Sequence, residues 1–115
     1  MKEEDLFDPL IEYLQGQGYE ILEQHRGHEH GIDIVANKNG RKLFVELKGD
    51  SKAPDVDFGT LVYQIMKELK PSSDSDYAIA VSEQYRKHAD RCRFPLRKLG
   101  IKVYLIDETG ITPFF

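Results

Sequence analysis

Cysteine is nearly absent from this sequence: Cys92 is the one cysteine among 115 residues, so no disulfide can form within the chain. A chain without disulfides fits a reducing compartment, and we therefore expect a cytoplasmic protein. The sequence also lacks any run that approaches the roughly 20 apolar residues of a membrane-spanning helix. Its acidic start does not resemble a signal peptide. We expect no membrane partner.

Repeats, internal linkers and low-complexity segments are missing as well. Apolar residues make up 40% of the chain and charged residues 31%, which is ordinary for a globular protein. We therefore expect one domain spanning residues 1–115, and a chain of this length can bury a substantial core.

Positive charge is in short supply, because 16 lysines and arginines face 20 aspartates and glutamates, for a net charge of −4 at pH 7. This balance argues against a protein that coats nucleic acid without specificity. The charges are uneven, however: acids dominate residues 1–33, whereas bases dominate residues 83–102. We expect the basic segment to bind phosphate groups through Arg86, Lys87 and Arg91, and a merely solvated helix face is the alternative.

The clearest local signal is a β-hairpin in residues 31–49. Two β-branched, apolar runs flank Asn39-Gly40, and both turn residues tolerate positive φ. A two-residue turn at this point sets Lys38 opposite Arg41. The pairing of every other residue in the two strands follows from that register.

Counting back from the turn places Asp33 opposite Glu46. Side chains alternate between the faces of a strand, so Lys48 shares the face of Glu46. Two acids facing each other in apolar strands repel, and an unpaired charge there is costly. A divalent cation between them would remove the cost, and carboxylate oxygens are the ligands that Mg²⁺ selects.

Gly-Ile-Asp33, a hairpin and then Val-Glu46-Leu-Lys48 together resemble the PD-(D/E)XK signature of the restriction-endonuclease-like nuclease superfamily. The pattern is that of Mrr-like restriction endonucleases and archaeal Holliday-junction resolvases. The resemblance implies a nuclease that depends on Mg²⁺, for which Mn²⁺ can substitute, and that cleaves nucleic acid, with DNA the expected substrate. It assigns the metal to Asp33, Glu46 and the backbone carbonyl of Leu47, and catalysis to these acids together with Lys48.

The same resemblance suggests accessory residues on two helices. Phe7-Asp8-Pro9-Leu10-Ile11 is similar to the first helix of Mrr-like proteins, where an acid helps to complete the metal site. Asp8 stands at that position, as Asp rather than Glu, and Glu12 is the alternative ligand. Gln64, on the helix after the Glu-x-Lys strand, is expected to hold the attacking water or Lys48. The alternative for all three is an ordinary polar helix surface.

Histidines gather in one stretch, His25-Arg26-Gly27-His28-Glu29-His30. Zinc sites normally hold their ligands on rigid elements, whereas this stretch is a loop with flanking glycines, which argues against a metal site. We expect the loop to hang over the active site, with His28 and His30 contacting substrate phosphate. Simple exposure to solvent is the alternative.

The chain as a whole predicts the element order α-βββ-α-β-α-β. Helices are expected from Asp5 to about Gly16, over 57–70 and over 83–99, with Pro95 kinking or restarting the last. Strands are expected at 19–24, in the hairpin, at 77–82 and at 101–106, with an edge strand at 111–115 because of Pro113. This order indicates an α/β protein with the restriction-endonuclease-like core, a mixed central sheet flanked by helices.

Three functional hypotheses remain open. The leading one is a metal-dependent endonuclease, and the presence of Asp33, Glu46 and Lys48 together favours it. Since one centre cuts one strand, we expect a homodimer or a subunit of a larger assembly. The second is a catalytically silent nucleic-acid-binding or assembly module of the same fold. The third, a protein-interaction domain, rests only on the acidic net charge.

Overall fold

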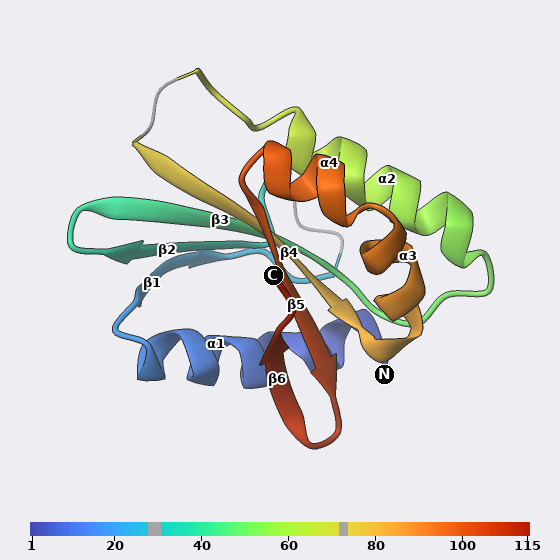
Figure 1. The fold of residues 1–115 in the computed structure, drawn as a ribbon. Helices are drawn as coiled ribbons and strands as arrows, with labels where there is room; N and C mark the ends of the chain where they lie inside the picture. Colours follow the sequence, from blue (N-terminus) through green and yellow to red (C-terminus); the bar gives the residue numbers. More distant parts are fainter. Residues whose placement is uncertain (28–30, 72–73) are drawn as a thin grey trace.

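The computed structural model describes residues 1–27, 31–71 and 74–115. The strands of this described part form one six-stranded sheet in the order β1-β2-β3-β4-β5-β6 (Figure 1). The first three strands are antiparallel, β4 and β5 run parallel to β3, and β6 returns antiparallel along β5. The strands are β1 Glu20–Gln24, β2 Ile34–Lys38, β3 Arg41–Lys48, β4 Ser75–Ser82, β5 Ile101–Asp107 and β6 Gly110–Pro113.

Helices cover both faces of this sheet (Figure 1). On one face lie the short 3₁₀ helix η1 and helix α1, and on the other lie η2, α2, α3 and α4. Their bounds are η1 Glu3–Leu6, α1 Phe7–Gly16, α2 Pro54–Met66, η2 Glu83–Tyr85, α3 Arg86–Arg91 and α4 Arg93–Lys98. The α/β class and the mixed, helix-flanked sheet expected from the sequence are therefore confirmed. No helix in the described ranges is long and apolar enough to cross a membrane.

The hairpin forms with the predicted register. Lys38 pairs with Arg41 across the turn, and Asn39 and Gly40 have φ values of 53° and 83°. The last pair in the ladder is Ile34 with Val45. One step further from the turn come Asp33, just before β2, and Glu46 on β3. The predicted juxtaposition of the two acids therefore results from the register that the turn sets.

Alternation along β3 separates its side chains between the two cores. Val45 and Leu47 pack with α1, whereas Phe44 packs on the α2 side. Glu46 shares the α2 side and is buried, with 8% of its surface exposed. The alternation of side chains along β3 thus places an acidic side chain in the interior. Burial of its charged form is unfavourable unless another group compensates the charge.

Two helices differ from the sequence-based expectation. α1 begins at Phe7 rather than at Asp5, because residues 3–6 form the 3₁₀ helix η1. α2 spans Pro54–Met66 rather than 57–70, because proline suits the first helical position, where no N–H partner is needed.

The expected restart of the helix over 83–99 is confirmed, since the helix is divided at Cys92, whose φ and ψ of −101° and 13° are not helical. Pro95 has no N–H to give the carbonyl four residues earlier, so the helix stops at Arg91 and restarts as α4. The edge position of β6, with Pro113, is as predicted.

Candidate active site

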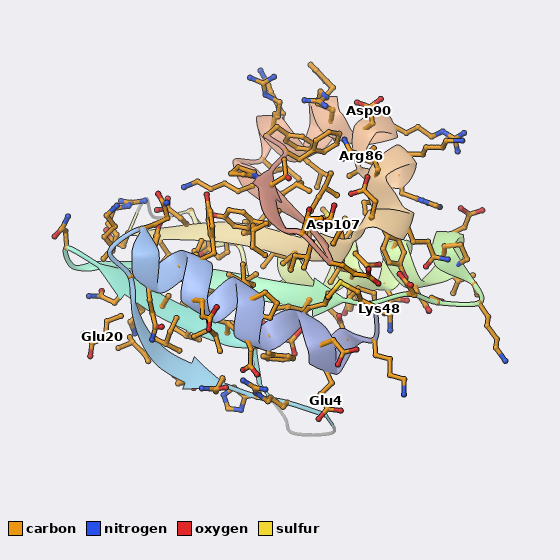
Figure 2. All side chains as sticks on the ribbon, turned by 90° about the horizontal axis from the view of Figure 1, so that it is seen from below. Glu4, Glu20, Lys48, Arg86, Asp90 and Asp107 are labelled. Carbon is orange, nitrogen blue, oxygen red and sulfur yellow. The ribbon has the colours of Figure 1, made fainter. Side chains whose placement is uncertain are left out.

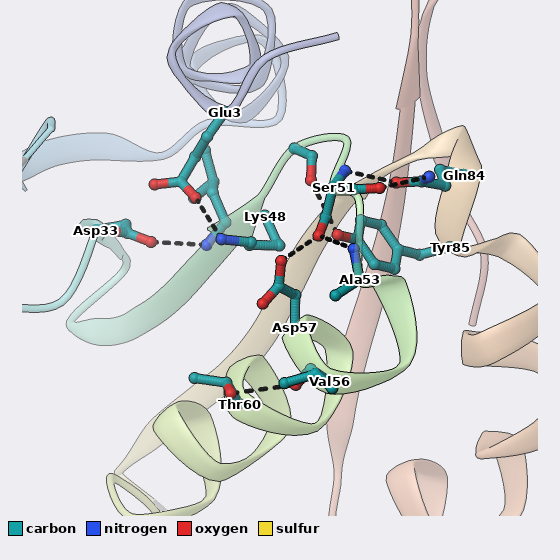
Figure 3. A network of polar contacts seen from close by, with 12 residues as sticks. Glu3, Asp33, Lys48, Ser51, Ala53, Val56, Asp57, Thr60, Gln84 and Tyr85 are labelled. Carbon is teal, nitrogen blue, oxygen red and sulfur yellow. Dashed lines mark hydrogen bonds and ion pairs between the residues drawn. The ribbon is translucent and has the colours of Figure 1, made fainter.

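A polar cavity of about 260 Å³ lies between η1, the end of the hairpin and α2. Figure 3 shows Glu3 reaching toward it from η1, Asp33 and Lys48 from the hairpin, and Asp57 from α2. Most of its lining side chains carry charge or an amide or hydroxyl group: Glu3, Asp33, Glu46, Lys48, Asp57, Thr60 and Gln64. The structure therefore gathers in one place the four residues predicted to be catalytic.

Asp33 is held in place by the strand opposite. Its Oδ2 accepts a hydrogen bond of 2.8 Å from the backbone N–H of Leu47, and its own carbonyl accepts one of 2.8 Å from the N–H of His25. Burial raises the pKa of Asp33, and the Leu47 N–H partly offsets that rise by favouring the charged form. The carboxyl of Asp33 also hydrogen-bonds that of Glu46.

Glu46 is the most perturbed acid of the cavity. Burial, followed by the negative charge of Asp33, raises the pKa of Glu46 to about 8. Two carboxyls that hydrogen-bond each other must have a proton between them, so at neutral pH the pair without a cation favours retaining one. The arrangement predicted from the hairpin register is thus present, together with the electrostatic cost that a cation would relieve.

Lys48 faces an acid that the sequence did not single out. Its Nζ lies 3.8 Å from Oε1 of Glu3, which hangs from η1 (Figure 3). Burial and the nearby charge of Asp33 raise the pKa of Glu3, whereas Lys48 lowers it. Glu3 thus adds a third carboxylate beside the pair.

The position of Glu3 depends on Gly49. A Cβ atom on Gly49 would lie 2.2 Å from the backbone nitrogen of Glu3, so only glycine allows η1 to approach the end of β3 this closely. Glu3 and Gly49 lie far apart in the sequence, so the spacing of residues along the chain does not predict their contact.

Asp8 and Glu12 do not line this cavity. Both are exposed, and Asp8 Oδ1 accepts a hydrogen bond of 2.7 Å from Arg26. The reason is the rotation of α1, which buries Phe7, Leu10 and Leu14 and thereby turns the two acids away. The acid from this part of the chain that does line the cavity is Glu3 of η1, upstream of the predicted position.

α2 contributes the opposite wall. Gln64 lines the cavity as expected, and it also borders an adjoining hollow shared with Glu46. Asp57, Thr60 and Gln64 lie on the same helical face, with about one turn between each residue and the next. Asp57 was expected only as a helix cap, and its carboxylate instead accepts a hydrogen bond from the hydroxyl of Ser51. The spacing to Gln64 was the signal that could have placed it in the site.

The remaining predicted residues fall elsewhere. His28 and His30 lie outside the described residues, although Gly27 and Gly31, on either side of them, line the cavity. Arg86, Lys87 and Arg91 are exposed on α3, and Figure 2 shows Arg86 well apart from Lys48. They do not contribute to the cavity, so any contact that they make with phosphate is a separate one.

The donor set suits magnesium better than zinc. In the described ranges, no group of three or more histidines, cysteines or acids is placed to enclose an ion. Mg²⁺ rarely needs such a cage, because it keeps several waters and is usually bound through one or two carboxylates and a substrate phosphate. Asp33 and Glu46 offer that pair, and the described residues that line the cavity include neither cysteine nor histidine.

Known relatives match only part of this sequence. No protein-family model matches the chain. A UPF0102 protein of Campylobacter hominis is 36% identical over 61 residues, covering 52% of this chain and 54% of the relative. A UPF0102 protein of Aquifex aeolicus is 42% identical over 50 residues, covering 43% and 48%. The chain thus spans about half the length of the curated relatives it matches.

Solved structures match almost the whole fold. An XisH family protein from Nostoc punctiforme superposes with a TM-score of 0.66 at 17% identity, covering 93% of this chain and 95% of that one. An fdxN element excision controlling factor protein from Anabaena variabilis gives 0.63 at 20% identity, with the same coverage. At such identities the likeness concerns the fold alone. The chain therefore shares its α/β fold with these two proteins and resembles UPF0102 proteins over about half its length.

Proposed function

We propose that this protein is a Mg²⁺-dependent endonuclease that hydrolyses phosphodiester bonds in nucleic acid, with DNA as its expected substrate. The observation that carries the proposal is the meeting of Asp33, Glu46 and Lys48 in one polar cavity. A buried and a half-buried carboxyl, both with a raised pKa and with an amine beside them, are unfavourable for folding, and a role in chemistry explains such groups better than packing does.

Asp33 and Glu46 would hold the metal, with the backbone carbonyl of Leu47 as a further oxygen ligand. Glu3 takes the part that the sequence resemblance assigned to Asp8 or Glu12, because it alone of the three lines the cavity. When bound, the ion supplies Lewis acidity to the phosphate and makes water more acidic. Mn²⁺ also accepts oxygen ligands, so we expect it to substitute.

The neighbouring side chains act on the reacting groups. The Lys48 amine would orient the attacking water or neutralise the charge that develops on the phosphate. Its contact with Glu3 keeps that amine within the cavity before substrate arrives. Gln64, on the opposite wall, would hold the water or Lys48 through its side-chain amide. The cationic surface of α3, with Arg86, Lys87 and Arg91, would add affinity for phosphate away from the cut bond.

We also propose a homodimer, and a surface of α2 favours it. Val56, Tyr63 and Met66 expose 67%, 65% and 44% of their surface, and the Cβ position of Gly59 faces open space. Their spacing of three, four and three residues forms one apolar stripe. Two antiparallel copies would set Gly59 of each against Tyr63 of the other, and Val56 against Met66. The stripe is therefore self-complementary, as a two-fold interface requires.

A cleavage assay tests the proposed enzyme. Duplex, single-stranded and branched DNA and RNA are incubated with Mg²⁺, Mn²⁺ or EDTA. We expect cleavage with either ion, none in EDTA, and none with Asp33→Asn. A wild-type protein that binds these substrates but cuts none of them under any condition would favour the silent module of the same fold.

A further inference from the structure

A second hollow, of about 390 Å³, lies on α4 and shares no lining residue with the catalytic cavity. It is lined by Arg93, Phe94, Arg97 and Lys98. Phe94 is the most exposed large apolar residue of the described chain, with 76% of its surface accessible. An aromatic ring surrounded by three cations is an unusual surface, and neither the hairpin motif nor the cavity accounts for it.

Phe94 has no evident role in folding. α4 is anchored through Leu96, its one buried residue, which joins the same core as α2. Elsewhere in the described ranges, no ring or cation stacks on Phe94. A phenyl ring left in water forgoes the burial that stabilises most aromatics, so its exposure calls for a partner outside the chain.

The cations around this ring point to the kind of partner. Arg97 and Lys98 form no ion pair with any acid in the part of the chain that the structure describes. Arg93 is fixed in place instead, 3.0 Å from Asp90 and with its guanidinium 4.6 Å from the ring centroid of Phe114. One oriented cation and two unpaired ones therefore border the exposed ring, and such a surface favours an anionic ligand.

We infer that this hollow binds a single-stranded segment of nucleic acid, with a base stacked on Phe94 and its phosphates held by Arg93, Arg97 and Lys98. Aromatic rings within a positive groove are the means by which proteins bind single strands without reading sequence. In a duplex the bases already stack on one another, so the face of Phe94 is of use only to an unpaired base. An exposed phenyl ring bordered by neutral or acidic residues would suit a protein partner equally well. Three bordering cations favour an anionic partner instead, and nucleic acid offers phosphates together with bases that stack.

This inference deepens the proposed function and, as regards substrate, rests on it. A nuclease with such a subsite acts on nucleic acid that carries unpaired nucleotides, such as a flap, a fork or a branched junction. α2 and α4 pack on the same face of the sheet, and α2 forms a wall of the catalytic cavity (Figure 1). Binding at α4 would contribute affinity and choice of substrate, and the reacting bond would remain with Asp33, Glu46 and Lys48.

The test measures binding without cleavage, by fluorescence anisotropy in EDTA. The probes are a labelled single strand, the same sequence fully paired, and a fork with one unpaired arm. We expect Phe94→Ala to weaken binding of the single strand and the fork by about 5- to 100-fold, the equivalent of losing one stacked base. The affinity of Phe94→Ala for the duplex should be unchanged. Phe94→Trp, which keeps an aromatic ring, should bind the single strand with an affinity close to that of wild type.

Two further variants serve as controls. Leu22→Ala removes another exposed apolar side chain, on β1, and should alter none of the three affinities. Arg97→Glu should weaken all three probes and reduce the salt dependence of binding. Equal affinity of wild type and Phe94→Ala for the single strand would overturn the inference. An equal loss of affinity of Phe94→Ala for all three probes would also overturn it. Either result would leave the cleavage assay, and therefore the proposed nuclease, unaffected.

Discussion

Nζ of Lys48 lies 3.8 Å from Oε1 of Glu3, so the lysine of the Glu-x-Lys strand is paired with an acid from the start of the chain. The ion pair therefore positions Lys48 without substrate. It also offsets the repulsion between Glu3 and Asp33. This contact joins η1, at the start of the chain, to the end of β3.

Lys48→Ala should separate catalysis from metal binding. We expect cleavage to fall by about 100-fold or more, because the amine acts on the reacting phosphate. Mn²⁺ binding by calorimetry should remain close to wild type, since Asp33 and Glu46 are intact. Equal loss of metal binding and cleavage in Lys48→Ala would show that the amine is needed to build the site.

Asp33→Asn should remove both properties, because a neutral amide is a poor ligand for Mg²⁺. Above pH 8, where both acids of the metal-free wild type are charged, the variant should gain about 0.2–1 kcal/mol of stability, because the repulsion between the two acids is lost. Urea denaturation in EDTA and in Mg²⁺ measures the two effects. A variant less stable than wild type in both buffers would mark Asp33 as a structural residue.

Glu3→Gln should weaken Mg²⁺ binding by about 10-fold if Glu3 supports the metal. The structure supplies matched controls, since Asp8→Asn and Glu12→Gln change acids that do not line the cavity. Calorimetric titration of all three variants compares them directly. A loss in Asp8→Asn rather than in Glu3→Gln would restore the role that the sequence pattern assigned to the first helix.

Stability without metal should decrease as the pH rises from about 5 to 8. The pKa of Glu46 is raised from an ordinary value of 4.5 to about 8 in the folded protein. Between these values the folded state binds a proton that the unfolded state has released, so deprotonation favours unfolding. The stabilising contribution is complete below the lower value and is lost as the pH rises through the upper one.

Thermal melting in EDTA across this pH range checks the effect. Glu46→Gln should flatten the dependence, and Mg²⁺ should reverse the loss at pH 8, because the cation favours the charged pair. Glu12→Gln, which changes an exposed acid of α1, is the control. A wild-type protein whose melting temperature rises steadily from pH 5 to 8 in EDTA would contradict the assignment.

Tyr63→Glu should convert a dimer into a monomer. A charge at the middle of the α2 stripe would be buried against Gly59 of the second copy, where it has no partner. Analytical ultracentrifugation of wild type and variant gives the mass directly. Leu22→Glu places the same charge on an exposed apolar position of β1 and should leave the dimer intact. A monomeric wild type at micromolar concentration would refute the interface.

Gly49→Ala should destabilise the protein by about 1–3 kcal/mol, as overpacking does, because its Cβ would clash with the backbone of Glu3. Gly16→Ala is the control, since the corresponding position on α1 meets open space. Urea denaturation compares the two, and similar stabilities would show that η1 can shift without cost.

The sequence predicted the centre of the site because that part is governed by local rules. Asn39-Gly40 fixes the turn, the turn fixes the register, and the register brings Asp33 to Glu46. Gln64 was expected from the resemblance, which implies a glutamine on the helix after the Glu-x-Lys strand. Glu3 could not be predicted in this way, because its place depends on a contact with Gly49 made through space.

The errors had equally physical causes. The rotation of α1 is set by Phe7, Leu10 and Leu14, and this rotation carries Asp8 and Glu12 away from the cavity. This outcome required knowledge of the packed core rather than of the local pattern. The restart of the last helix, by contrast, was predicted from Pro95, because proline lacks the N–H that would donate to the carbonyl of Arg91.

Every described residue that lines the catalytic cavity lies between Glu3 and Gln64, in the first part of the chain. The strands β4 and β5 and the helices α3 and α4 follow later and contribute none of these residues. The later part supports β3 from one side and carries the exposed ring and cations of α4. If the proposed function holds, chemistry and recognition are encoded in successive parts of the chain. Substitutions after Gln64 would then change which nucleic acid is bound while the reacting groups remain the same.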